Sequence, residues 1–312
     1  MKKFVAILIS SVFTISSVIA QFDPQFSQNM NFLSFSNPAM MSMDGKASVA
    51  GLNRQQWVGI TNAPVTTLFS FCLPFKIHDT KHVGGLLFLD DRIGLFANQG
   101  VYLQYAYQRN IWDGTLSLGT NIGVLNVNFD GTKVRWVTSD YHSASDPIVP
   151  TTEKNGISFD MTLGATYYDE TKYAGISLAH ITNPVIDIDE KAEIKVRPLL
   201  YLTGGYNFFP EDALYVIKPS LFFKTDFASW QLDLNTIIEY KQRFYGGISY
   251  RYQDAVVLLV GMKFSGINVC YAYDITTSKL ARAGGGSHEI MLSYSFVLER
   301  TKRNKTKSVR IL

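Results

Sequence analysis

Hydrophobic and polar residues alternate along most of this chain with a period of two residues. The run Ser229–Tyr240 shows the pattern most clearly. One parity of this run holds Trp230, Leu232, Leu234, Thr236, Ile238 and Tyr240, and the other holds Gln231, Asp233, Asn235, Ile237 and Glu239. A strand places neighbouring residues on opposite faces, so a strand separates these two sets. The same split returns in 115–124, 244–252 and 288–296, which predicts an all-β protein.

About 14 such runs lie between residues 46 and 298, and many approach the roughly 9 to 11 residues that a tilted strand needs to cross a bilayer. Turn-forming residues separate them. The long connections all follow odd-numbered runs, at Trp57–Ala63, Asp130–Asn155, Asn183–Val196 and Thr276–Gly286. Outer-membrane barrels have short periplasmic turns and longer external loops. We therefore predict a transmembrane outer-membrane β-barrel of about 14 antiparallel strands over 46–298, with both chain termini in the periplasm.

The start of the chain has the layout of a secretory signal peptide. Lys2 and Lys3 precede an uncharged stretch, and small residues lead up to Ala20. We therefore predict that residues 1–20 are a signal peptide. Residues 21–45 are too irregular for a strand and too rich in Phe and Met for a solvated tail. This N-terminal segment is predicted to pack inside the barrel as a plug or beneath it in the periplasm.

Composition narrows the class of protein further. Aromatic residues make up 13% of the chain and charged residues only 18%, below the roughly 25% of ordinary soluble proteins. Tyr and Trp favour membrane interfaces, so the apolar parity is predicted to contact outer-membrane lipid. The formal net charge is +3, and much of the excess lies in residues 299–312, a basic tail that we expect in the periplasm. The charge therefore predicts no nucleic-acid partner.

No pattern in the chain predicts an active site, a cofactor or a metal centre. His142 and Ser143 lie near Asp140 in a predicted loop, but loop composition produces such groupings by chance. The nucleophile motif Gly-x-Ser-x-Gly and the zinc motif His-Glu-x-x-His are both missing from the sequence. The acidic pair Asp90-Asp91 is expected to be solvated charge rather than a calcium ligand. We therefore predict no catalytic residues.

Three stretches carry residues that barrel building alone does not explain. They lie in the N-terminal segment, at the end of the first predicted strand, and around the last two strands. The candidate partner-binding residues in them are Asp23, Pro24, Gln25, Phe26, Asn37, Pro38, Arg54, Trp57, Gly59, Tyr273, Asp274, His288 and Glu289. A lumenal Arg54 and an interfacial Trp57 are the simpler interpretation of the second stretch. His288 and Glu289 are adjacent in a predicted strand, so they should face opposite sides.

In their order and spacing these stretches resemble the PorP/SprF membrane proteins of the Bacteroidetes type IX secretion system. The resemblance rests on Asp23-Pro24-Gln25-Phe26-Ser27-Gln28, Asn37-Pro38-Ala39, Asn53-Arg54, Gln56-Trp57, Gly59, Ala63-Pro64, Tyr273-Asp274-Ile275, His288-Glu289-Ile290 and Tyr294-Ser295-Phe296. Residues from about 110 to 260 match only as a generic barrel. The resemblance implies a partner for exported proteins such as gliding adhesins and for other secretion components.

Two classes of function follow from these patterns. The first is a non-enzymatic barrel that assists the export or surface anchoring of large secreted proteins. The alternative is an outer-membrane diffusion channel or small-molecule transporter, which a polar lumen equally allows. A third class, an outer-membrane enzyme, would depend on His142 or Ser143. An occupied lumen favours the first class over the second.

Overall fold

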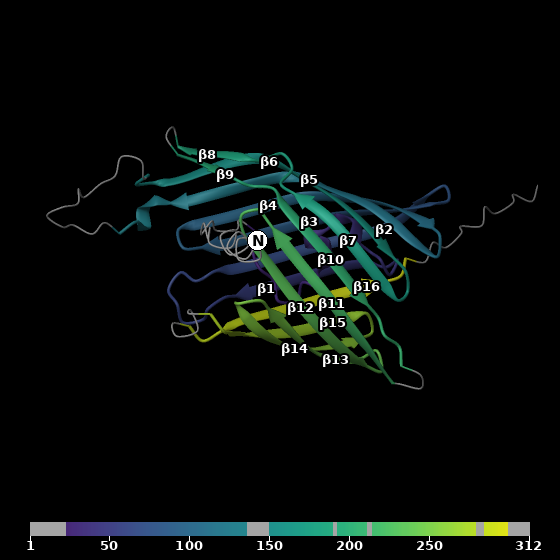
Figure 1. Ribbon diagram of the computed structural model, residues 1–312. Coiled ribbons are helices and arrows are strands. Elements are labelled where there is room, and N and C mark those ends of the chain that lie inside the picture. Colours follow the sequence, from purple (N-terminus) through teal and green to yellow (C-terminus); the bar gives the residue numbers. More distant parts are fainter. Residues whose placement is uncertain (1–22, 136–149, 190–191, 211–213, 279–283, 299–312) are drawn as a thin grey trace, which may run out of the picture.

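The strands close into a ring. The computed structural model describes residues 23–135, 150–189, 192–210, 214–278 and 284–298. Fourteen antiparallel strands form a closed barrel, and two further strands form a separate sheet (Figure 1). The first strand pairs with both the second and the last, so closure at the chain ends leaves neither of these strands with an unpaired edge. The predicted fold class, an all-β outer-membrane barrel of about 14 strands, is confirmed.

The elements have the following bounds. The barrel strands are β1 (Ala47–Gln55), β2 (Val65–Ile77), β3 (Thr80–Ile93), β4 (Phe96–Ile111), β5 (Gly114–Asp130), β6 (Glu153–Tyr168), β7 (Lys172–Ala179), β10 (Leu199–Tyr206), β11 (Tyr215–Thr225), β12 (Trp230–Tyr240), β13 (Phe244–Arg251), β14 (Ala255–Phe264), β15 (Ile267–Thr276) and β16 (Ser287–Phe296). The separate sheet holds β8 (Val185–Asp189) and β9 (Ala192–Lys195). The helices are α2 (Leu33–Ser36) and the two 3₁₀ turns η1 (Pro38–Met40) and η2 (Gly131–Lys133).

The two faces of the strands have the polarity that the alternation predicts. On β12, Leu234 faces outward with 49% of its surface exposed, whereas its neighbour Asn235 faces inward and is 3% exposed. Outward positions are apolar along most of the wall. They become polar near the end of β5, at Asn126 and Asn128, and near the start of β6, at Asn155. The apolar band is therefore the surface that contacts lipid.

The long connections all lie at one end of the barrel, as predicted. The four long connections follow β1, β5, β7 and β15, which are the first, fifth, seventh and thirteenth strands of the ring. We call this end the long-loop end and the other the short-turn end. At the short-turn end, the connection from β10 to β11, residues 207–214, is longer than the other turns, and an isolated bridge joins Phe208 to Ile217 beside the end of β10.

The wall has unequal height around the ring. Strands β4, β5 and β6 have 16, 17 and 16 residues, whereas β7 and β10 have 8 each. Above the shorter strands, the β8–β9 hairpin packs its apolar side chains Ile186 and Ile188 against the inner face of β5 at Leu125 and Val127. Figure 1 shows this hairpin beside β5 and β6, toward the long-loop end of these strands. The predicted long loop after the seventh strand is therefore an ordered hairpin.

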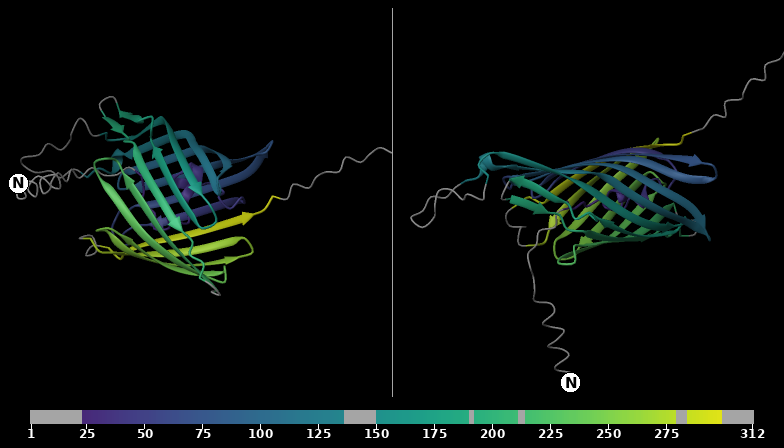
Figure 2. Two further views of the ribbon diagram at one scale, coloured as in Figure 1. Left: turned by 45° about the vertical axis from the view of Figure 1, so that its right-hand side comes forward. Right: turned by 90° about the horizontal axis from the view of Figure 1, so that it is seen from above.

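The N-terminal segment from Asp23 onward lies inside the barrel, as one of the two predicted positions for it (Figure 2). Phe26 is 7% exposed and packs edge to face against Phe35, with 5.0 Å between the ring centroids. The segment starts at the long-loop end, where Asp23 contacts His180 just beyond β7. It ends at the short-turn end, where Ala47 pairs with Phe296. The two ends of the described chain thus lie at opposite ends of the barrel.

Several predictions fall on residues that the structure does not describe. The predicted signal peptide 1–20, the basic tail 299–312 and the pair His142-Ser143 all lie outside the described residues. The periplasmic position of the two chain termini stays a prediction. Within the described ranges, no helix combines the length and the apolar character needed to cross a membrane.

Candidate functional site

The first clamp on the N-terminal segment is a carboxylate of the last strand. Glu289 on β16 accepts hydrogen bonds from the backbone N–H groups of Ser27 and Gln28, each at 2.8 Å. Its side chain has no exposed surface. The two N–H groups belong to an irregular segment that lacks a strand partner, so a carboxylate that accepts from both satisfies them at once.

A buried ion cluster surrounds this carboxylate. Arg54 on β1 donates to Glu289 at 3.0 Å, to Asp274 on β15 at 2.8 Å and to the hydroxyl of Ser27 at 2.7 Å. Arg251 on β13 donates to Asp274 at 3.2 Å and to the backbone oxygen of Phe26 at 3.3 Å. Charged side chains buried away from water are tolerated only when each is paired with an opposite charge. The motif residues Arg54, Asp274 and Glu289 therefore act together to hold the N-terminal segment, here called the plug, inside the barrel.

Asp23 is held at a second point, by side chains from three different places in the wall. His180 Nε2 lies 2.9 Å from the Asp23 carboxylate, and Tyr201 donates its hydroxyl to the other carboxylate oxygen. Lys224 donates to the Asp23 backbone oxygen at 3.2 Å. Burial lowers the pKa of His180, but Asp23 and Asp160 on either side of its ring outweigh burial and raise that pKa to about 10. Burial raises the pKa of Asp23, yet His180 and Tyr201 hold it below its usual value.

This contact predicts a specific pH dependence. His180 has its raised pKa only in the folded state, so its stabilising contribution is complete below about pH 6.5 and declines as the pH rises to about 10. We expect the free energy of unfolding in detergent micelles to fall over that interval, and His180→Gln should remove most of this fall. Equal slopes for the wild type and His180→Gln would contradict the ion pair. The pKa of Asp23 is lowered in the folded state, so this carboxylate contributes stability at neutral pH that is lost when acid protonates it.

The motif Asn37-Pro38-Ala39 lies on a floor of three glycines, Gly119 on β5, Gly164 on β6 and Gly175 on β7. The Asn37 side-chain amide donates to the backbone oxygens of Ala165 and Ile176, each at 3.2 Å, and its oxygen accepts from the Ala39 N–H at 3.0 Å. A side chain at Gly119 on β5 would collide with the backbone of Pro38 and Ala39. These strands therefore carry glycine because the plug backbone approaches them closely.

Gly119→Ala is expected to destabilise the protein by about 1 to 3 kcal/mol, because the added methyl group overpacks the contact with the plug. Gly246→Ala on β13 is the matched control. Its new Cβ would meet nothing nearer than the Leu259 oxygen at 3.7 Å, so little change is expected. The free energy of unfolding by urea in micelles measures both variants. A neutral Gly119→Ala would show that this part of the plug is not packed against β5.

The remaining predicted residues lie at the rim rather than in the clamp. Trp57 follows β1 and donates its N–H to the Ser287 hydroxyl at 3.1 Å. Gly59 has a φ of 100°, which favours glycine in that loop. The Tyr273 hydroxyl donates to the Gly285 backbone oxygen at 2.9 Å. His288 faces outward with its Nδ1 at 2.7 Å from the Tyr271 hydroxyl, so the prediction that it faces away from Glu289 is confirmed.

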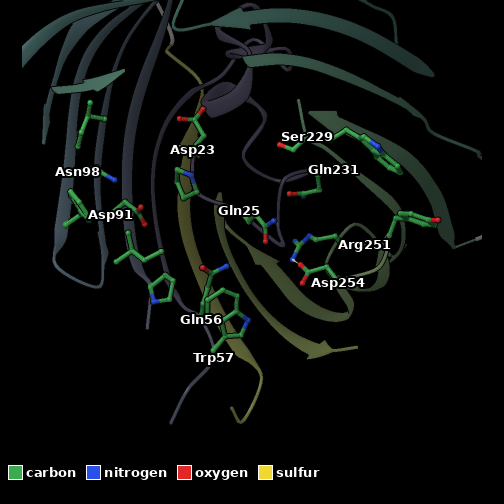
Figure 3. Close-up of a pocket in the computed structure, with 17 residues that line it drawn as sticks. Asp23, Gln25, Gln56, Trp57, Asp91, Asn98, Ser229, Gln231, Arg251 and Asp254 are labelled. Atoms are coloured by element: carbon green, nitrogen blue, oxygen red, sulfur yellow. Dashed lines mark hydrogen bonds and ion pairs between the residues drawn. The ribbon is translucent and has the colours of Figure 1, made fainter. Parts of the chain in front are cut away.

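Above the plug, the long-loop end encloses a cavity of about 590 Å³ (Figure 3). Its floor is the start of the N-terminal segment, so Pro24 and Gln25 line it beside Asp23. Its wall includes aromatic, aliphatic and polar residues, namely Gln56, Trp57, Pro64, Asp91, Ile93, Phe96, Asn98, Ile194, Ser229, Trp230, Gln231, Arg251, Tyr252 and Asp254. The expectation that Asp91 is solvated is wrong, because its side chain points inward from β3 and is 6% exposed.

Sequence reasoning missed several residues that hold the plug. His180, Tyr201, Lys224 and Arg251 are each buried, yet none belongs to a recognisable motif. Asp233 was assigned correctly to the inward face, but not as the partner of Asn29, whose amide donates to it at 3.0 Å. A charged residue on the inward parity near a strand end was the only signal available.

Comparisons with known proteins agree with this architecture. Residues 18–294 match the family described as type IX secretion system membrane protein PorP/SprF. No curated relative matches the chain. Among solved structures, a TodX deltaS2S3 mutant monoaromatic hydrocarbon channel is similar at a TM-score of 0.51 and 10% identity, over 85% of this chain and 94% of that one. At such low identity, this likeness shows the barrel fold alone.

Two further solved structures are similar at lower scores. The monoaromatic hydrocarbon channel CymD has a TM-score of 0.49 and 13% identity, over 90% of this chain and 95% of that one. The Ralstonia pickettii toluene transporter TbuX has a TM-score of 0.49 and 12% identity, over 85% of this chain and 92% of that one.

Proposed function

Because the chain belongs to the PorP/SprF family of type IX secretion system membrane proteins, we propose that it is a non-enzymatic outer-membrane adaptor. It assists the export or surface anchoring of a large secreted protein, such as a gliding adhesin. Its partners are that exported protein and other components of the secretion system, and its outward face contacts lipid. It works by contacts at its ends rather than by conducting solutes.

The observation that carries this proposal is the occupied lumen. The segment from Asp23 to the start of β1 lies inside the barrel and is fixed at three places, by Glu289, by His180 and by the glycine floor below Asn37. A diffusion channel needs a continuous polar passage, whereas a component that only binds other proteins does not. Buried ion pairs at two of the three places oppose easy removal of the segment.

The two ends of the barrel then have different partners. We propose that the long-loop end is external, because longer loops are external in known outer-membrane barrels. The exported protein contacts this end, where the β8–β9 hairpin and the cavity lie. Other secretion components contact the short-turn end in the periplasm, where β16 ends at Phe296. In this orientation Asp23 lies near the external mouth, and the C-terminal end of β16 faces the periplasm.

Conductance in planar bilayers tests the proposal. The purified full-length protein is expected to show no steady conductance, whereas a variant that lacks residues 23–41 should conduct if it inserts. A steady conductance or solute flux from the wild type would contradict the adaptor and support the channel alternative. In cells, deletion of the gene should block surface display of at least one secreted protein. Normal display of every secreted protein would contradict the secretion role.

Removal of residues 299–312 is expected to leave barrel assembly intact, because Phe296 completes the last strand and an aromatic residue can end that strand. Heat-modifiable migration on gels measures assembly, and surface labelling measures display of the secreted protein. Six basic side chains in this tail can attract an acidic periplasmic partner, so we expect display to fall. Loss of assembly would contradict the first expectation, and normal display would contradict the second.

A further inference from the structure

We propose that the cavity at the long-loop end binds a positively charged side chain, an arginine or a lysine, carried by an extended segment of a partner polypeptide. The proposed function enters only as the source of that polypeptide, which is the exported protein. The binding site itself is inferred from the side chains that line the cavity.

Asp91 is a buried carboxylate that lacks a cation. It is 6% exposed and accepts a hydrogen bond from the Thr66 hydroxyl at 2.6 Å. In the described part of the chain, no lysine, arginine or histidine lies within ion-pair distance of Asp91. The carboxylates of the plug clamp differ, since Asp233, Asp274 and Glu289 each contact an arginine. An unpaired buried carboxylate is costly, and an incoming cation would remove that cost.

In the part of the chain that the structure describes, Gln231 carries a second polar group without a partner at the same cavity. Its side chain is 7% exposed, and its amide nitrogen donates to Asp233 at 2.9 Å. Its amide oxygen has no donor among the described residues. In Figure 3 the Gln231 side chain extends toward the space above Gln25. This oxygen is itself buried in the free protein, so a backbone N–H group of a bound segment would satisfy it once the Gln231 side chain turns toward the cavity.

The two groups lie on opposite walls. Asp91 belongs to β3 and Gln231 to β12, and β3 is seven steps from β12 along the ring of strands. Figure 3 shows the two side chains on different sides of the cavity. A small cation could neutralise only Asp91. An extended peptide could place a cationic side chain at Asp91 and a backbone N–H group at Gln231 at the same time. This separation is why we assign a polypeptide segment as the occupant.

The charges and rings around the cavity agree with a cation. Arg251 is the only arginine or lysine that lines the cavity in the described residues, and it is already engaged by Asp233, Asp254 and Asp274. The carboxylate of Asp23 is engaged by His180. Trp57 presents an aromatic surface to the cavity, which attracts cations and accepts apolar side chains equally. The volume of about 590 Å³ lies within the range of roughly 300 to 1,000 Å³ that binding sites occupy.

The test uses the purified full-length protein in detergent micelles and three probes. The first is the capped peptide Gly-Gly-Arg-Gly-Gly, the second has neutral citrulline in place of arginine, and the third is methylguanidinium alone. Quenching of tryptophan fluorescence reports binding, because Trp57 lines the cavity. We expect the arginine peptide to bind at least about tenfold more tightly than either other probe.

Two variants and one control locate the site. Asp91→Asn should abolish the preference for arginine over citrulline. Gln231→Leu should weaken the arginine peptide by about tenfold and leave methylguanidinium unchanged. Asp44→Asn is the control, because Asp44 is exposed and precedes β1 at the short-turn end. Heat-modifiable migration shows that each variant is folded.

Each other outcome overturns the proposal. Equal binding of the arginine and citrulline peptides would exclude recognition of charge. Methylguanidinium binding as tightly as the peptide would show a site for a small cation. No binding of the arginine peptide at millimolar concentration, or an unchanged preference in Asp91→Asn, would exclude the site. None of these results depends on solute conductance, so this proposal and the adaptor function can fail separately.

Discussion

Replacement of Arg54 by Met is expected to destabilise the folded barrel by about 3 to 5 kcal/mol and to loosen the plug. The substitution removes the shared partner of Asp274 and Glu289 while both carboxylates stay buried, at 2% and 0% exposed. It also removes a donor to the Ser27 hydroxyl. The free energy of unfolding by urea in micelles measures the first effect. Conductance in planar bilayers measures the second, because a displaced plug opens the lumen.

Two comparisons separate the loss of pairing from the loss of a side chain. Adding Glu289→Gln to Arg54→Met should recover part of the stability, because one buried charge is removed. Lys195→Met breaks an ion pair with Glu193 in which both side chains are largely exposed, so it should change the stability little. If Arg54→Met cost no more than Lys195→Met, the buried cluster would not be what holds the plug.

Leu234→Arg is expected to reduce folding into lipid vesicles and to cost about 2 to 4 kcal/mol, because the residue faces the apolar band. Asn235→Arg is a poor control, since Asn235 already contacts Asn29 of the plug and Arg would not fit there. Asn155→Arg is better matched. Asn155 faces outward on β6 beyond the apolar band and is exposed, so little effect is expected. Equal folding yields for Leu234→Arg and Asn155→Arg would contradict the assigned band.

The fold could be predicted because it depends on local order. Alternation along β12 assigns Leu234 and Asn235 to opposite faces without knowledge of any other strand, and loop length sorts the two ends of the barrel. The plug contacts could not be predicted in this way. Ser27 and Glu289 are 262 positions apart, and no periodicity links them. The motifs identified Arg54, Asp274 and Glu289 as special, but their shared task became visible only in the folded chain.

The residues that were missed share a physical reason. His180, Tyr201 and Lys224 are single inward residues at the ends of ordinary strands, and they matter because Asp23 happens to lie between them. Asp91 was misjudged because an acidic pair near a predicted strand end is usually solvated. Its burial follows from the wall height and the plug below it, which are properties of the whole barrel.

Arg54 and Glu289 are direct cross-strand neighbours in the ladder that joins β1 to β16. The complete set of contacts on Ser27 therefore forms only when the first and last strands have met, and these are the strands farthest apart in the order of synthesis. Before they meet, the buried charges of Arg54 and Glu289 lack each other as partners. Closure of the ring and binding of the N-terminal segment thus become cooperative, because the pairing of the last strand with the first forms contacts that both depend on.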